Sequence, residues 1–217
     1  MASADPRLRP CGSSSAWQNQ RQYYKRRGPK KIMTQQFPPA RFPLDPCPDD
    51  FMQTAKLGWN LVANLPVSVN RAFELVTDAN LEREWFPNYK NARWSAEPGV
   101  GVEREYELSY MRIIERFTIW EPGSRFQFWV SSCSLPILQR FAEDYRFLER
   151  SPRETGLYWS IRYEPRRELR ALRPMLSPLF AKDFRLAIRR IEALAVRDSL
   201  KKHDRNVEPN RSHGAAP

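Results

Sequence analysis

Five strand-length segments follow one another between residues 102 and 164, and one long amphipathic segment comes after them. In the segment 102–110, Arg104, Tyr106 and Leu108 alternate with glutamates, and an alternation of period two is typical of a half-buried strand. Short turn sequences such as Glu-Pro-Gly at 121–123 separate the segments, which favours antiparallel neighbours. The pattern therefore predicts an antiparallel sheet accompanied by one long helix.

The remaining elements complete an α+β architecture. The long segment carries Phe180, Phe184 and Ile188 at spacings of four, which is typical of a helix with one buried face. We predict a curved antiparallel sheet wrapped around this C-terminal helix, with two short helices after the first strand. In chain order the predicted strands are 57–66, 93–96, 102–110, 112–120, 125–131, 141–149 and 157–164, and the predicted helices are 69–77, 81–85 and 174–196.

The net charge of +11 is concentrated at one end of the 217-residue chain. The first 44 residues hold nine basic residues and one acid, and eight of the 19 prolines lie within residues 1–50. We therefore predict a disordered basic tail at 1–50, a folded domain at 57–197 and a disordered polar tail at 198–217. The basic tail is a solubiliser, a contact for an anionic surface such as RNA or lipid headgroups, or an organelle-targeting segment.

Scarce residue types exclude several kinds of chemistry. Both histidines, His203 and His213, lie near the C-terminus, so the domain has none for a Ser-His pair or a metal site. Glycine-rich phosphate-binding motifs are missing, and we predict no cofactor and no metal. Three well-separated cysteines favour a reducing compartment, which makes the cytoplasm the expected location. No apolar run approaches the roughly 18 residues of a membrane span.

Arg104 and Glu115 are the most informative polar residues of the predicted sheet. Arg104 shares a face with Tyr106, and a guanidinium on an apolar face must be paired, reach water at the rim or face a wet cavity. In a cavity it would anchor a ligand carboxylate or phenolate. Glu115 has apolar neighbours two residues away on either side, so it is a partner for Arg104 or Arg112, or a candidate catalytic acid or base.

Aromatic side chains with a few polar groups are typical of a pocket for a small molecule. Gln127 and Trp129 form a candidate pair for one wall, although their strand cannot be oriented from its pattern. The predicted ligand-binding residues are Arg104, Tyr106, Leu108, Tyr110, Glu115, Gln127, Trp129, Trp159, Phe180 and Phe184.

The domain resembles the polyketide cyclase/dehydrase and lipid-transport family of the START-like (SRPBCC, Bet v 1-like) superfamily. The likeness rests on the opening LPVSVNRAFELVTDANLEREW, which ends at Trp85, on GVGVERE, on ERFTIWEPGSRFQFWV and on the long last helix. It covers about residues 57–196. The resemblance implies the helix-grip fold, whose members mostly enclose a hydrophobic small molecule.

Three functions remain open from the sequence. The first is a non-catalytic binding protein for a lipid, polyketide or similar aromatic ligand, held between sheet and helix. The second is a cofactor-independent cyclase, aromatase or dehydratase in which Glu115 or a tyrosine transfers protons. The third is a protein- or RNA-binding module that uses the basic N-terminal tail, where Tyr23 and Tyr24 stand beside a run of basic residues.

Overall fold

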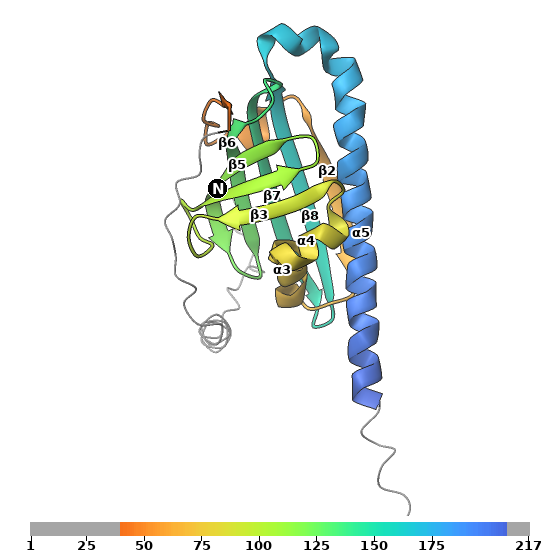
Figure 1. The fold of residues 1–217 in the computed structure, drawn as a ribbon. Coiled ribbons are helices and arrows are strands. Elements are labelled where there is room, and N and C mark those ends of the chain that lie inside the picture. The colour runs from red at the N-terminus through yellow and green to blue at the C-terminus, as the bar shows by residue number, and fades with distance from the viewer. Residues whose placement is uncertain (1–39, 208–217) are drawn as a thin grey trace, which may run out of the picture. The chain divides into compact units, whose positions relative to one another are not determined.

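The computed structural model describes residues 40–207, and in this part of the chain one antiparallel sheet carries a long helix across it. The strands are β1 Phe42–Pro43, β2 Gly58–Leu65, β3 Tyr89–Trp94, β4 Glu103–Leu108, β5 Arg112–Glu121, β6 Arg125–Cys133, β7 Leu138–Ser151 and β8 Glu154–Pro165. The helices are α2 Phe51–Thr54, α3 Val69–Thr77, α4 Ala79–Trp85, the short 3₁₀ helix η1 Arg167–Leu172 and α5 Arg173–Val207. Figure 1 shows α5 running along the sheet, with α3 and α4 beside it.

The sheet follows the order β2-β8-β7-β6-β5-β4-β3, and every pairing is antiparallel. The short β1 lies off this path and pairs with β6. Strands β3 to β8 are joined in sequence to their neighbours, while β2 closes the order by pairing with the last strand, β8. The predicted architecture, a sheet and long C-terminal helix with two short helices after the first predicted strand, is confirmed.

The two short helices begin and end for local reasons. Helix α3 has the predicted bounds and buries Ala72, Phe73, Leu75 and Val76. Asp78 then caps α4, because its carboxylate accepts a hydrogen bond from the backbone N–H of Asn80 at 2.9 Å. The helix ends before the Phe-Pro pair that follows Trp85. As a result α4 is a short helix, and it faces the sheet.

The turn between β5 and β6 requires glycine. Gly123 has a φ of 77°, and a Cβ atom at this position would lie 2.5 Å from the Asn70 side chain of α3. Pro122 precedes it, as in a turn that places proline second and glycine third. The Glu-Pro-Gly sequence predicted this turn.

Several segments differ from the predicted boundaries. Within the segment predicted as a tail, residues 40–50 pack against the domain: Ala40 and Leu44 are buried, and β1 pairs with the end of β6. At the other end α5 continues to Val207. The rest of the predicted tails, residues 1–39 and 208–217, lies outside the described residues. Among residues 40–207, no helix has the length and apolar character needed to cross a membrane.

Aromatic rings fill the space at the centre of the fold. Phe73 of α3 contacts Trp120, Phe126 and Phe147 with ring centroids 5.4–5.8 Å apart. On the other side Trp59 of β2 stacks on Tyr163 of β8. Because ring pairs at these separations add to the apolar burial, the first group helps to hold α3 against the sheet and the second joins β2 to β8.

Candidate functional site

A cavity lies between the inner face of the sheet, helix α4 and the described part of α5. The volume of the cavity is about 60 Å³, or about 700 Å³ when the open space at its mouth is included. Since one water needs roughly 10–15 Å³ of cavity volume, the cavity has room for several waters or a compact ring compound. Most lining side chains are aromatic or aliphatic, and they come from β2, α4, β4, β5, β6, β7, β8 and α5: Trp59, Glu82, Trp85, Phe86, Arg104, Tyr106, Leu108, Tyr110, Met111, Ile113, Glu115, Phe128, Leu138, Phe141, Glu143, Tyr145, Tyr163, Phe180, Asp183 and Phe184.

Arg104 occupies the polar end of the cavity and is paired twice. Its Nε donates to Oε2 of Glu115 at 2.5 Å, and its Nη1 donates to Oε1 of Glu82 at 2.6 Å. Arg104 and Glu115 are direct cross-strand neighbours on β4 and β5, while Glu82 reaches them from α4. All three are buried, with exposed fractions of 6%, 2% and 2% for Arg104, Glu82 and Glu115. The guanidinium is therefore a structural counter-ion and does not reach water at a rim.

Aromatic rings complete the surroundings of this cation. The guanidinium carbon lies 5.0 Å from the ring centroid of Trp94, 4.9 Å from that of Tyr106 and 5.5 Å from that of Phe117. A guanidinium over ring faces is stabilised by their negative quadrupole, most strongly when water is excluded. The rings also hold Arg104 in one orientation, so that its pairing with both carboxylates is preorganised.

A third buried carboxylate belongs to Glu143 on β7. Its Oε2 accepts hydrogen bonds from the Tyr145 hydroxyl at 2.7 Å and from Nε1 of Trp159 at 2.9 Å. Trp159 in turn stacks on Tyr145, with ring centroids 4.8 Å apart. Glu143 lines the same cavity as Glu82 and Glu115, so three carboxyl groups share one guanidinium.

Burial raises the pKa of all three carboxyl groups. For Glu82 the pKa rises to about 7, because desolvation and the neighbouring Glu115 outweigh the attraction of Arg104. For Glu143 it rises to about 8, where desolvation outweighs the hydrogen bond from Tyr145. Desolvation also raises the pKa of Glu115, and Arg104 opposes that rise. The values for Glu82 and Glu143 lie near neutral pH, which is the range useful for acid–base chemistry.

These shifts predict that the protein becomes less stable as the pH rises. Between an unfolded pKa near 4.5 and folded values of about 7 for Glu82 and about 8 for Glu143, the folded chain binds more protons than the unfolded chain. The free energy of unfolding therefore falls across this window by several kcal/mol, at about 1.4 kcal/mol for each unit of pKa difference that is titrated. Urea unfolding at several pH values measures it.

The Glu143→Gln variant is the control for this pH dependence. A neutral amide retains an oxygen that accepts from Tyr145 and Trp159, and it removes one titrating group. We expect the variant to show a flatter decline in the free energy of unfolding. An unchanged slope would mean that Glu143 ionises normally in the folded protein.

A polar contact around Asp183 of α5 lies at the edge of the cavity. Oδ2 of Asp183 accepts from the Tyr110 hydroxyl at 3.0 Å and from Nδ2 of Asn88 at 3.3 Å. Tyr110 lies just after β4 and is 40% exposed, and Asn88 precedes β3 with a φ of 62°. Three separate segments thus meet at one carboxylate beside the cavity.

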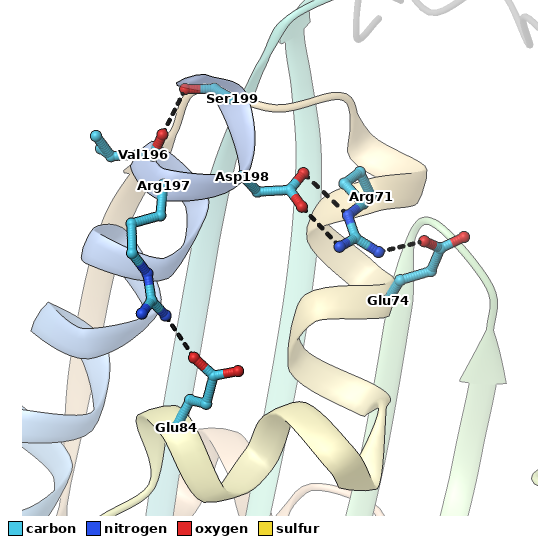
Figure 2. Close-up of polar contacts among 7 residues, drawn as sticks. All are labelled: Arg71, Glu74, Glu84, Val196, Arg197, Asp198 and Ser199. Carbon is cyan, nitrogen blue, oxygen red and sulfur yellow. Dashed lines mark hydrogen bonds and ion pairs between the residues drawn. The ribbon is translucent and has the colours of Figure 1, made fainter. Parts of the chain in front are cut away.

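Ion pairs near the end of α5 fix α3 and α4 against it (Figure 2). Arg71 of α3 makes two hydrogen bonds to Asp198 of α5, at 2.7 and 3.0 Å, and a further one to Glu74 at 3.0 Å. Arg197 of α5 donates to Glu84 of α4 at 2.5 Å. Because Glu84 lies between Glu82 and Trp85 in the sequence, this contact helps to position α4 over the cavity.

Seven of the ten predicted ligand-binding residues line the cavity. They are Arg104, Tyr106, Leu108, Tyr110, Glu115, Phe180 and Phe184. The alternation along β4 correctly identified the inward-facing residues of this strand, and the apolar stripe on α5 identified Phe180 and Phe184. Whether they contact a ligand stays a prediction.

The other three predicted residues do not line the cavity. Gln127 faces away from it and donates to Thr118 at 3.1 Å, and Trp129 follows Gln127 by two residues on the same outward face. The reason is that Phe126 and Phe128 take the inward positions of β6. Trp159 does face inward, but it is fully buried behind Glu143 and Tyr145. It contacts these two lining residues and not the cavity itself.

Three acidic residues of the site, Glu82, Glu143 and Asp183, were missed from the sequence, and the first two had a usable signal. Glu143 has aromatic neighbours two residues away on either side of it on β7, Phe141 and Tyr145, which is the same pattern that singled out Glu115. Glu82 lies three residues before Trp85 on α4, and residues at this spacing share a helix face. A buried Trp85 therefore implied a buried Glu82.

Solved structures with the same architecture define the fold class. The Zhui aromatase/cyclase from Streptomyces sp. R1128 has a TM-score of 0.56 at 12% identity and covers 65% of this chain and 94% of its own. A START superfamily protein from Mycobacterium smegmatis reaches 0.54 at 12% identity, covering 64% and 97%. Ara h 8.0201 reaches 0.52 at 12% identity, again covering 64% and 97%. The chain thus has the START/Bet v 1-like helix-grip fold.

Sequence comparison places the chain within one family of that fold. The model of the family described as polyketide cyclase/dehydrase and lipid transport matches residues 61–196, and the chain belongs to this family. Uncharacterized proteins of Mycobacterium bovis and Mycobacterium tuberculosis are 30% identical to it over 114 residues, which is 51% of this chain and 68% of theirs. The family resemblance predicted from the sequence is confirmed.

Proposed function

We propose that the domain binds a hydrophobic small molecule, such as a lipid, a polyketide or a similar aromatic compound, in the cavity between the sheet and α5. The observation that carries the proposal is the lining itself. Aromatic and aliphatic side chains surround a small group of buried polar atoms at one end, and this combination is typical of sites that bury an apolar ligand and orient it by a few polar contacts.

The comparisons support this proposal without naming a ligand. The family description includes lipid transport as well as cyclisation and dehydration. Burial of the ligand's apolar surface would supply most of the binding free energy, at roughly 25 cal/mol per Å². Rings such as Trp59, Tyr106 and Phe184 offer flat walls for that contact.

A fluorescence titration of the full chain with 1-aminoanthracene tests the proposal. This uncharged, compact, aromatic probe brightens when it leaves water. We expect saturable binding of one probe per chain with a Kd in the micromolar range, since about 8 kcal/mol corresponds to 1 μM. Urea-unfolded protein is the control. A linear, unsaturable response equal to that of the unfolded chain would reject the proposal.

A cofactor-independent cyclase or dehydratase is the second candidate function. The observation that favours it is the set of three carboxyl groups with raised pKa around one cavity, at Glu82, Glu115 and Glu143. An ionised carboxylate could take a proton from carbon while a protonated carboxyl returns one to oxygen. Unchanged turnover of a substrate by the Glu115→Gln variant would exclude Glu115 from that role.

The contact proposed between residues 1–50 and an anionic surface rests on charge alone. Residues 1–39 lie outside the described residues, so the support is the sequence: nine basic residues and one acid within the first 44. Retention of the full chain on an anionic matrix, compared with that of a chain lacking residues 1–39, tests the proposal. Equal retention would leave this segment as a solubiliser.

A further inference from the structure

Two polar atoms of α4 are buried at the cavity without a hydrogen-bond partner among residues 40–207. They are Oε2 of Glu82 and Nε1 of Trp85, and both residues line the cavity. A buried polar atom without a partner costs roughly 1–3 kcal/mol, so native proteins rarely keep one without a reason. Two on adjacent turns of one short helix indicate a position where a ligand supplies the missing partners.

The chemistry of the two atoms is complementary. The carboxylate oxygen of Glu82 accepts a hydrogen bond, while the indole nitrogen of Trp85 only donates one. Residues three apart share a helix face, so the two side chains extend from the same side of α4. A hydroxyl group fits such a pair, because it donates through its hydrogen and accepts through its oxygen.

The existing pairs of Arg104 disfavour an anionic ligand at this position. The guanidinium of Arg104 already donates to Glu82 and Glu115, and Glu143 adds a third carboxyl group at the same cavity. A ligand carboxylate would have to displace one of these partners to pair with Arg104, and would leave the displaced carboxyl group buried without its partner. The expectation that Arg104 anchors a ligand carboxylate is therefore disfavoured by the pairing that the structure shows.

We propose that the ligand is an uncharged, largely apolar molecule carrying a hydroxyl group, which donates to Oε2 of Glu82 and accepts from Nε1 of Trp85. This inference rests on the proposed function, since it names the ligand class of the same cavity. The apolar remainder of the molecule lies against Tyr106 and Phe184, toward Asp183 at the edge of the cavity.

A matched series of naphthalene derivatives tests the inference on the full chain at pH 7. The probes are 2-naphthol, naphthalene and 2-naphthoate, which share a ring system and differ in the polar group. We expect 2-naphthol to bind at least 10-fold more tightly than naphthalene and at least 100-fold more tightly than 2-naphthoate. Competition against 1-aminoanthracene gives the Kd of each.

The outcomes separate this inference from the proposed function. Equal affinity for 2-naphthol and naphthalene, or tightest binding of 2-naphthoate, would overturn the hydroxyl assignment while leaving a hydrophobic binding site. If neither 1-aminoanthracene nor any naphthalene derivative binds, the proposed function fails and the inference fails with it.

Two variants test the assigned atoms directly. Glu82→Gln keeps an oxygen for Arg104 and replaces the free acceptor by a donor, so the preference should move at least 10-fold from 2-naphthol toward 2-acetonaphthone, whose carbonyl only accepts. Trp85→Phe removes the donor, leaves every charge in place and should weaken 2-naphthol at least 5-fold.

The exposed neighbour on the same helix supplies the control. Arg83→Gln removes the charge of an exposed arginine on α4, and it should leave all affinities unchanged. Thermal unfolding checks that each variant is folded. If folded Glu82→Gln and Trp85→Phe both keep the wild-type order of affinities, α4 does not carry the hydroxyl subsite.

Discussion

Replacing Arg104 by methionine is expected to lower the free energy of unfolding by about 3–5 kcal/mol at pH 7. Methionine matches the length of the arginine stem but leaves Glu82 and Glu115 buried without their counter-ion. It also removes a cation held against Trp94, Tyr106 and Phe117. Urea or guanidinium unfolding, followed by far-UV circular dichroism, measures the loss.

Two comparisons show whether the lost stability comes from the buried charges. Arg197→Met removes an arginine whose side chain is 58% exposed and pairs with Glu84, so it should cost less than about 1 kcal/mol. Adding Glu82→Gln and Glu115→Gln to Arg104→Met removes the stranded charges and should recover much of the stability. If Arg104→Met costs no more than Arg197→Met, the buried cluster is not held together by charge.

The cost of Arg104→Met should also depend on pH. Without the guanidinium, the folded protein holds protons on Glu82 and Glu115 more tightly than before. At a pH near 4.5 or below, these carboxyls are largely protonated in both states, and the penalty for the variant should shrink. A cost that is equal at pH 4.5 and pH 7 would indicate lost packing rather than lost pairing.

Filling the cavity is expected to abolish ligand binding. Leu108 is buried on β4 and lines the cavity, and the Leu108→Trp indole would occupy space that a ligand needs. We expect the affinity for 1-aminoanthracene to fall at least 100-fold, which corresponds to about 2.8 kcal/mol. Because the indole enters space that is already open, the loss of stability should stay near the lower end of the usual 1–3 kcal/mol cost of overpacking.

The matched control is the same substitution on the surface. Leu148 lies on β7 and is 54% exposed, so Leu148→Trp adds an indole without entering the cavity. The titration with 1-aminoanthracene should give the wild-type Kd for this variant. Wild-type affinity in folded Leu108→Trp would place the binding of the probe elsewhere on the protein.

Much of the fold could be predicted from local patterns, because each element carries its own signal. Helix α3 has the predicted bounds, since Ala72, Phe73 and Val76 mark its buried face and a proline precedes it. The hairpins were indicated by turn sequences such as that containing Gly123. What could not be predicted was the pairing of residues 42–43 with β6, because a two-residue strand has no periodicity to read.

Strand irregularities explain why local patterns were less reliable within the site. In β5 the register shifts between Phe117 and Ile119, and Trp120 rather than Ile119 contacts Phe73 and Phe126. Such a bulge reverses the faces of all later residues in a strand, and no simple alternation reveals it.

Burial of charge was the second limit of sequence reasoning. Glu105 on β4 alternates with Arg104 and Tyr106, and this pattern by itself favours a solvent-exposed position for Glu105. It does lie on the outer side, yet it is buried beneath Arg93 and Arg112, which both pair with it. Likewise the pairing of Glu82 with Arg104 joins residues from a helix and a strand, and only the tertiary fold brings them together.

The most direct test of the central claim is a crystal structure of the full chain saturated with 1-aminoanthracene. The account predicts electron density for one probe between the sheet and α5, in contact with Tyr106 and Phe184. Density for the probe only on the outer surface, with this cavity closed or filled by solvent alone, would contradict it.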